Sequence, residues 1–187
     1  MSPAEEHRTI AGTFTDRVRG VRDWDVPSPV PDWRARDVVR HLVEWFPAFL
    51  ADGSDLRLPA VPSVDDAPVG AWEQHTTAVQ ALLDDPANAE IAFAHPRLPQ
   101  SPLPQAIAQF YTGDVFLHTW DLARATGQDD RLDPERCQMM FEGMQPLDEM
   151  LRQSGQYGPR VPVAEDADVQ DRLVGFIGRD PAWQPSS

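Results

Sequence analysis

One stretch of the sequence carries a carboxylate and an imidazole at a spacing that a helix would align. Asp114 and His118 stand four residues apart in GDVFLHTWDLARATG (113–127), and Asp121 follows three residues later. On a helix these positions lie one above another, on a face that the apolar residues of the segment also share. A buried carboxylate and imidazole are costly unless something compensates them, and a divalent cation does so by taking both as ligands.

His41 is likewise a polar residue among apolar ones, on an earlier segment. It lies three residues after Val38 and four before Trp45, inside an apolar stripe of helical spacing. One histidine from this helix and the Asp/His pair from another could converge, and three such ligands plus water make a metal site with an open position. The spacing is therefore compatible with a divalent metal held by His41, Asp114 and His118.

Purely structural roles stay open for the same residue types. A lone histidine on an apolar face is usually a hydrogen-bonded core residue, and an Asp–His pair at this spacing is often a simple hydrogen bond. We interpret His7 and His75 as solvent-facing, and His95, in a loop before Pro96, as a candidate for a pocket mouth. Cys137 is interpreted as a small buried apolar residue, of unknown role beyond that.

Composition excludes several other functions. The net charge is −14, so the surface repels nucleic acid and anionic membrane. All 16 basic residues are arginine, which excludes lysine Schiff-base and P-loop chemistry and suggests a GC-rich, actinobacterial source. A single cysteine excludes an intramolecular disulfide, and the Glu-x-x-His, HExxH, GxSxG and GxGxxG motifs are absent from the sequence.

Helical periodicity dominates the chain, and 19 prolines separate the periodic segments. The spacing of apolar residues predicts helices over 3–22, 34–51, 67–84, 103–126, 133–153 and 167–178. Asp32 is the candidate N-cap of the second helix, which Pro47 could kink, and Gly127 is the predicted stop of the fourth. The connection 85–101 could contain a short strand in its AEIAFAH portion.

Four main helices with one or two accessories predict an all-α protein, an up-and-down four-helix bundle in a single domain over 1–187. The N-terminal residues lack the basic and apolar regions of a secretory signal, and no apolar run approaches the ~20 residues that span a bilayer. We expect a cytoplasmic protein with no membrane contact.

Three segments together resemble a known family. They are PSPVPDWRARDVVRHLVEW (27–45), GDVFLHTWDLARATG (113–127) and YGPRVPVAEDADVQDRLVGFIGRDPAW (157–183). The chain resembles the DinB-like (DinB/YfiT-like) metal-binding proteins of actinobacteria. More narrowly, it resembles the N-terminal domain of mycothiol-dependent maleylpyruvate isomerase and its short single-domain relatives.

The resemblance implies a four-helix bundle with zinc or nickel bound by three side chains, which would be His41, Asp114 and His118. The acidic ligand is often Glu in the isomerases, and the shorter Asp here could shift the metal. Asp121 would hold His118 or another helix in place from behind the ligands. The isomerases carry a further C-terminal domain that contributes to the active site, and this sequence ends at Ser187, so maleylpyruvate isomerisation does not transfer safely.

The leading functional hypothesis is a metal-dependent enzyme that uses a low-molecular-weight thiol, mycothiol by the resemblance, to attack a small electrophile by transfer or isomerisation. Arg124 could bind an anionic substrate or instead cap its helix. The competing hypothesis is a non-catalytic metal or small-ligand binding module, and a third is a structural bundle without metal. Relatives often dimerise, so the resemblance allows a homodimer.

Overall fold

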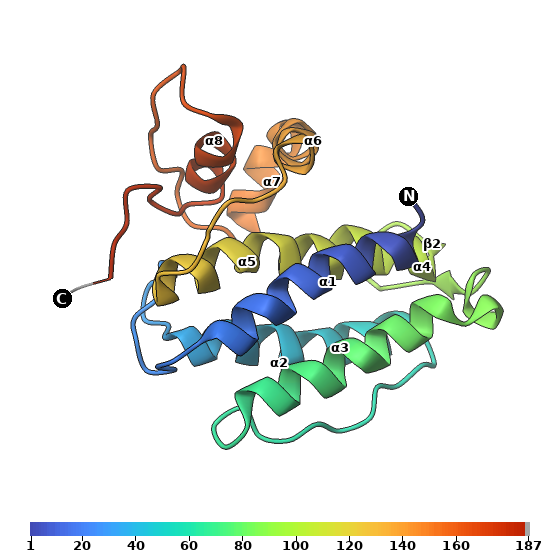
Figure 1. Cartoon of the computed structure of the whole chain (residues 1–187). Helices are drawn as coiled ribbons and strands as arrows, with labels where there is room; N and C mark the ends of the chain where they lie inside the picture. Colours follow the sequence, from blue (N-terminus) through green and yellow to red (C-terminus); the bar gives the residue numbers. More distant parts are fainter. Residues whose placement is uncertain (186–187) are drawn as a thin grey trace.

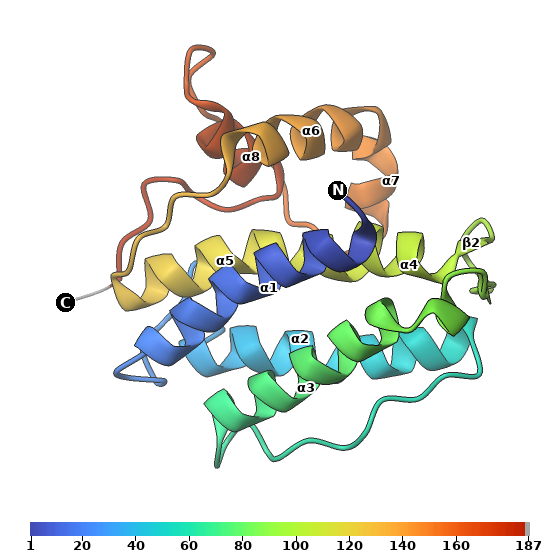
Figure 2. The same ribbon diagram turned by 45° about the vertical axis from the view of Figure 1, so that its right-hand side comes forward.

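The structure, a computed structural model, describes residues 1–185 and is mostly helical with one very small sheet, which agrees with the all-α prediction. Four long helical segments pack side by side: α1 (Pro3–Gly20), α2 (Ala35–Gly53), α3 (Pro68–Asp84) and the continuous run α4 (Leu103–Ala106), η2 (Ile107–Thr112) and α5 (Gly113–Thr126). Both α1 and α2 contact α3 and α5, so each segment has two neighbours (Figures 1 and 2). Within 1–185 no helix is both long and apolar enough to cross a bilayer.

The smaller elements lie in the connections and after α5. They are η1 (Pro86–Asn88), the antiparallel pair β1 (Ala92–Phe93) and β2 (Ser101–Pro102), then α6 (Pro134–Met144), η3 (Gln145–Leu147), α7 (Asp148–Gln153) and α8 (Val169–Phe176). α6 packs on α8, and both lie on the side of α5 that faces away from α2 and α3 (Figures 1 and 2). The prediction of one helix over 133–153 is wrong, because Pro146 cannot donate its backbone hydrogen bond and restarts the helix as η3.

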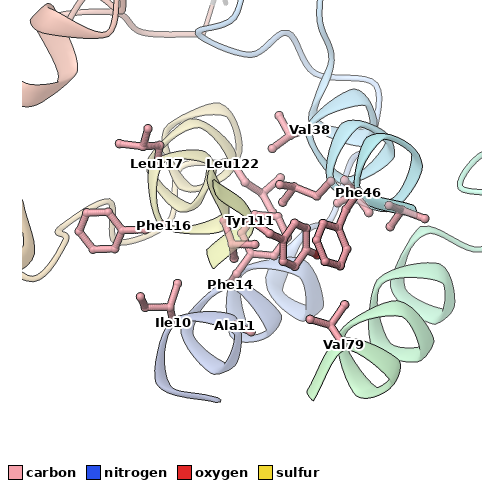
Figure 3. Close-up of a cluster of buried hydrophobic side chains, with 14 of the residues drawn as sticks. Ile10, Ala11, Phe14, Val38, Phe46, Val79, Tyr111, Phe116, Leu117 and Leu122 are labelled. Carbon is pink, nitrogen blue, oxygen red and sulfur yellow. The ribbon is translucent and has the colours of Figure 1, made fainter. Parts of the chain in front are cut away.

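Aromatic side chains fill the centre of the four packed segments. Phe46 of α2 stacks on Tyr111 of η2 with ring centroids 4.1 Å apart, and Phe14 of α1 meets Trp72 of α3 edge-on at 4.5 Å. Figure 3 shows Phe46 and Tyr111 side by side between the helices. Each such ring stabilises the fold by roughly 1.5–3 kcal/mol through burial. This packing sets the rotation of α2 and α5, and with it the direction of their polar residues.

The fourth segment contains a π-helical turn that the sequence pattern did not reveal. Over Ile107–Thr112 the backbone bonds reach five residues back, and Gly113 N–H donates to the carbonyl of Ala108. The wider turn changes the phase between α4 and α5, so that Tyr111 points into the core while Asp114 points toward α2. π turns of this kind are frequent at functional sites. Gly127 ends α5 in the left-handed region (φ 66°), as predicted.

The start of α2 differs from the prediction. Asp32 is not the N-cap, because it adopts φ 65° in the tight turn before the helix, a conformation that Asp tolerates better than most residues. The helix instead begins after Arg34, whose N–H donates to the carboxylate of Asp37 at 2.8 Å. The turn is closed by Ser28 N–H, which donates to the carbonyl of Trp33 at 2.9 Å.

Candidate metal centre

The three predicted ligand residues meet between α2 and α5. One nitrogen or oxygen from each of His41, Asp114 and His118 lies within 4.8 Å of the others. His41 Nε2 is 3.0 Å from Asp114 Oδ2, and His118 Nε2 is 3.5 Å from Asp114 Oδ1. The His118 side chain is 6% exposed while that of His41 is 32% exposed, so the cluster is anchored inside and open on one side.

The hydrogen bond between His118 and Asp121 leaves the other ring nitrogen of His118 available for a cation. Its Nδ1 lies 2.8 Å from Asp121 Oδ2, and Asp121 is fully buried and paired with Arg179, so Asp121 is an ionised acceptor and Nδ1 is the donor. With the proton of a neutral ring on Nδ1, the lone pair of Nε2 would face Asp114 Oδ1, another acceptor 3.5 Å away. A proton or a metal cation between these two atoms stabilises such a pair. Ligands of a tetrahedral zinc stand about 3.3 Å apart, which fits this donor set.

Charge and hydrogen bonds keep Asp114 ionised. Burial pushes the pKa of Asp114 upward, but His118 and the hydrogen bonds from His41 and Trp45 outweigh it and hold that pKa below its usual value. Trp45 Nε1 donates to Asp114 Oδ2 at 3.0 Å, the same oxygen that faces His41. Burial, with the charge of Asp114, raises the pKa of Tyr157 to about 12, so this phenol from the C-terminal segment stays protonated at neutral pH.

A tryptophan from the Pro-rich loop covers both imidazoles. The Trp33 ring is stacked on His118 at 5.7 Å between centroids and lies 5.1 Å from the His41 ring. The tight turn that contains Asp32 delivers it there, since Pro27 and Arg34 pair across the turn. The position of the Pro-x-Pro-x-Trp loop just before the helix that carries His41 thus places Trp33 over the two imidazoles.

Asp121 lies behind His118, and its second partner is Arg179, which the sequence did not predict. Arg179 donates to both carboxylate oxygens, from Nε to Oδ1 and from Nη2 to Oδ2, each at 3.2 Å. Burial raises the pKa of Asp121, but the Arg179 charge and the His118 hydrogen bond prevail and lower it. The signal in the sequence was the Gly-Arg-Asp-Pro-x-Trp run at 178–183, which carried the resemblance without a role for its arginine.

Two histidines predicted to face solvent are buried instead. His7 of α1 accepts or donates at Thr112 Oγ1 (3.0 Å), and His75 of α3 packs against Phe46 and Tyr111. The solvent-facing interpretation is therefore wrong. The spacing held the signal, since each histidine falls three residues from a core residue of its own helix, His7 before Ile10 and His75 after Trp72.

The remaining candidates have structural partners away from the three ligand residues. His95 is buried against Phe49 and Phe93, and its place at a pocket mouth stays a prediction. Arg124 pairs with Asp130 at 2.7 Å, which makes it part of the end of α5. Cys137 is fully buried, as predicted, and burial raises the pKa of its thiol to about 11.

The turn that presents Arg179 depends on a glycine, which gives a testable prediction. Gly178 has φ 89°, and a Cβ there would lie 3.0 Å from backbone atoms of Gly158 and Pro159. Gly178→Ala should lower the free energy of unfolding by about 2 kcal/mol, measured by urea denaturation. Gly12→Ala is the matched control, because nothing lies within 4 Å of its Cβ position in the interior of α1. It should raise stability by about 0.5–1 kcal/mol; equal effects in both variants would contradict the role given to the turn.

Comparisons with known proteins agree with these observations. Residues 7–123 match the family model described as the mycothiol maleylpyruvate isomerase N-terminal domain. The chain is also similar to two uncharacterized proteins of Mycobacterium tuberculosis, from strains CDC 1551 / Oshkosh and H37Rv. Each is 28% identical over 187 residues, which cover 96% of this chain and 98% of the relative. No solved structure gives a significant match.

The family match contains most of α1, all of α2 and α3 and most of α5, and therefore all three proposed ligand residues and Asp121. It ends before α6, so Tyr157 and Arg179 lie outside it. The resemblance drawn from the sequence is confirmed: the chain belongs to the family of the mycothiol maleylpyruvate isomerase N-terminal domain.

Proposed function

We propose that this protein is a DinB-type four-helix up-and-down bundle, a single cytoplasmic domain, that binds one divalent metal, Zn²⁺ or Ni²⁺, through His41, Asp114 and His118. We propose further that it acts as a transferase or isomerase, in which a mycothiol-type thiol attacks a small electrophile. The observation that carries the proposal is the convergence of three ligand atoms within 4.8 Å, with His118 oriented by a buried carboxylate.

The arrangement suits a site that admits a thiol. A divalent cation held there would lower the pKa of a thiol bound to it and so supply a thiolate at neutral pH. The chain's own residues define the rest: Asp114 and the two imidazoles hold one side, and the 32% exposure of His41 leaves the other side open to a ligand. The Trp33 ring shields the imidazoles from part of the solvent, which strengthens charge interactions at the centre.

Thiol binding is the first test of this function. The Co²⁺-loaded protein should show a new thiolate-to-cobalt absorption band when mycothiol is added, and His41→Ala should lose the band because it lacks one ligand. The metal-loaded wild type should then consume the thiol with a panel of small electrophiles faster than a chelated sample does. A metal-loaded protein that neither binds the thiol nor exceeds the chelated sample would contradict the enzymatic proposal.

The alternative is a non-catalytic metal or small-ligand binding module. Two cavities of about 480 and 550 Å³ along residues 141–176 offer a place for a small ligand apart from the three proposed ligand residues. The same titration separates the two proposals. Stoichiometric metal without a thiolate band supports the binding module, and no metal at all contradicts the enzyme and a metal-binding module alike.

A further inference from the structure

The polar network behind His118 ends on a residue from the far end of the chain. Arg179 follows α8, and its guanidinium donates to both oxygens of Asp121 at 3.2 Å. Asp121 is fully buried and the Arg179 side chain is only 12% exposed, so water hardly screens the pair. From Asp121 the network continues to His118 Nδ1 at 2.8 Å.

We propose that Arg179 is a positioning residue of the metal centre: it holds the Asp121 carboxylate, which in turn holds the His118 ring in the tautomer that binds metal. The inference rests on the proposed metal site. It also extends that site beyond the family match over 7–123, because it makes the C-terminal segment that follows α5 a working part of the centre.

The geometry of the guanidinium is what this role requires. Its two N–H groups form a rigid fork that fixes the plane of a carboxylate, which a single point charge cannot do. With the plane fixed, Oδ2 of Asp121 stays in line with Nδ1–H of His118, and Nε2 is left with its lone pair on the side of Asp114. Loss of the fork frees the carboxylate to turn and removes the charge that compensates it.

Arg179 is itself held in place by the backbone of the C-terminal segment. Its N–H donates to the carbonyl of Val174 at 3.0 Å, which closes the turn after α8. Gly178 lies against Gly158 and Pro159, and Arg152 donates to the carbonyls of Gly158 and of Phe176 in α8, which ties the two segments together. The segment therefore presents the guanidinium at a fixed depth and angle beside α5.

The test uses the full chain with Arg179→Gln, Arg179→Lys, Asp121→Asn and the double variant Asp121→Asn/Arg179→Gln. Long-range ¹H–¹⁵N spectra of the metal-free proteins should show His118 as the Nδ1–H tautomer in the wild type and as a tautomer mixture in Arg179→Gln. Affinity for Zn²⁺, measured by chelator competition, should fall about 10–100-fold in Arg179→Gln. The double variant should bind no more weakly than Asp121→Asn alone, because both changes break one chain of contacts.

Arg172→Gln is the matched control, since Arg172 belongs to the same segment but lies over the Phe141 ring at 4.6 Å. It should keep the tautomer, and its affinity for Zn²⁺ should stay within about twofold of the wild type.

A folded Arg179→Gln with the wild-type tautomer and an affinity for Zn²⁺ within about threefold of the wild type would overturn the inference, as would additive losses in the double variant. If Arg179→Gln does not fold, Arg179→Lys decides: it keeps the charge without the fork, so wild-type behaviour of that variant would overturn the inference. If the wild type itself takes up no metal, the proposed function fails, while the tautomer in metal-free protein still decides the role of Arg179.

Discussion

Replacement of His118 by alanine is expected to abolish stoichiometric binding of Zn²⁺ or Ni²⁺. The imidazole is 6% exposed and is oriented by Asp121, so its loss removes a preorganised ligand rather than a mobile one. If a binding free energy of about 10–16 kcal/mol is shared among four ligands, one ligand contributes about 2.5–4 kcal/mol, which corresponds to a loss of roughly 100- to 1,000-fold in affinity. Chelator competition with purified, reloaded protein measures the change.

The relative loss of metal affinity in His41→Ala and His118→Ala gives a second, more specific test. His41→Ala should also lose metal, but by less than His118→Ala, because the His41 side chain is 32% exposed and less of its orientation is fixed. His95→Ala is the matched control: it deletes a buried imidazole that packs on Phe49 and Phe93, apart from the three ligand residues. Equal metal content in the wild type, His41→Ala and His118→Ala would rule out the proposed ligands.

Acidification is expected to destabilise the metal-free protein strongly between pH 6.5 and 4. Burial lowers the pKa of His75 from 6.5 to about 4, and burial with the charges of His75 and Arg8 does the same for His7, against the opposing Asp84. Because these pKa values are lower in the folded state, the stabilisation is complete above about pH 6.5 and is lost as the pH falls toward 4. Each histidine accounts for about 3 kcal/mol, a large share of the stability of a typical domain.

His75→Phe isolates this effect, since aromatic rings already surround His75. The variant should lose about 3 kcal/mol less than the wild type when urea denaturation is compared at about pH 7.5 and about pH 4. Val79→Ala, one turn further along α3, removes buried methyl groups but no titratable group. It should therefore lower the free energy of unfolding by the same amount at both pH values. A wild type and a His75→Phe variant that lose equal stability on acidification would refute the assignment.

The acid-sensitive pair also lies close to the proposed metal site. His7 contacts Thr112 at 3.0 Å, two residues before Asp114, and both histidines pack beside Tyr111 in the π-helical turn. Protonation of the core therefore acts on the same turn that starts α5. We expect the fold and the arrangement of the three ligand residues to be lost together in acid.

The features of the fold and of the site that depend on local residue spacing could be predicted from the sequence. The interval between Asp114 and His118 determines that a helix presents them on one face, and Gly127 ends that helix by its tolerance of positive φ. Spacing also placed His41 on the inner stripe of its own helix. It could not say which helices are neighbours, and the family resemblance supplied the partnership of His41 with the other two residues.

What the sequence did not predict depends on contacts between distant residues or on irregular backbone. Arg179 follows a glycine at φ 89° in a turn without periodicity, so no repeat pattern points it at Asp121. The π-helical turn over Ile107–Thr112 is stabilised by the packing of Tyr111 on Phe46, which only the assembled helices provide. His7 and His75 differ from these, because their helical spacing indicated burial even though histidine is a polar residue.

Anomalous diffraction from crystals of the Zn²⁺-loaded protein, recorded at the zinc edge, tests the central claim most directly. We predict a single strong peak per chain, about 2.0–2.2 Å from His41 Nε2, a carboxylate oxygen of Asp114 and His118 Nε2, with Asp121 still bonded to His118 Nδ1. A peak elsewhere, or a His41 ring turned away from the Asp114/His118 pair in metal-replete protein, would contradict the claim and leave only the helical architecture.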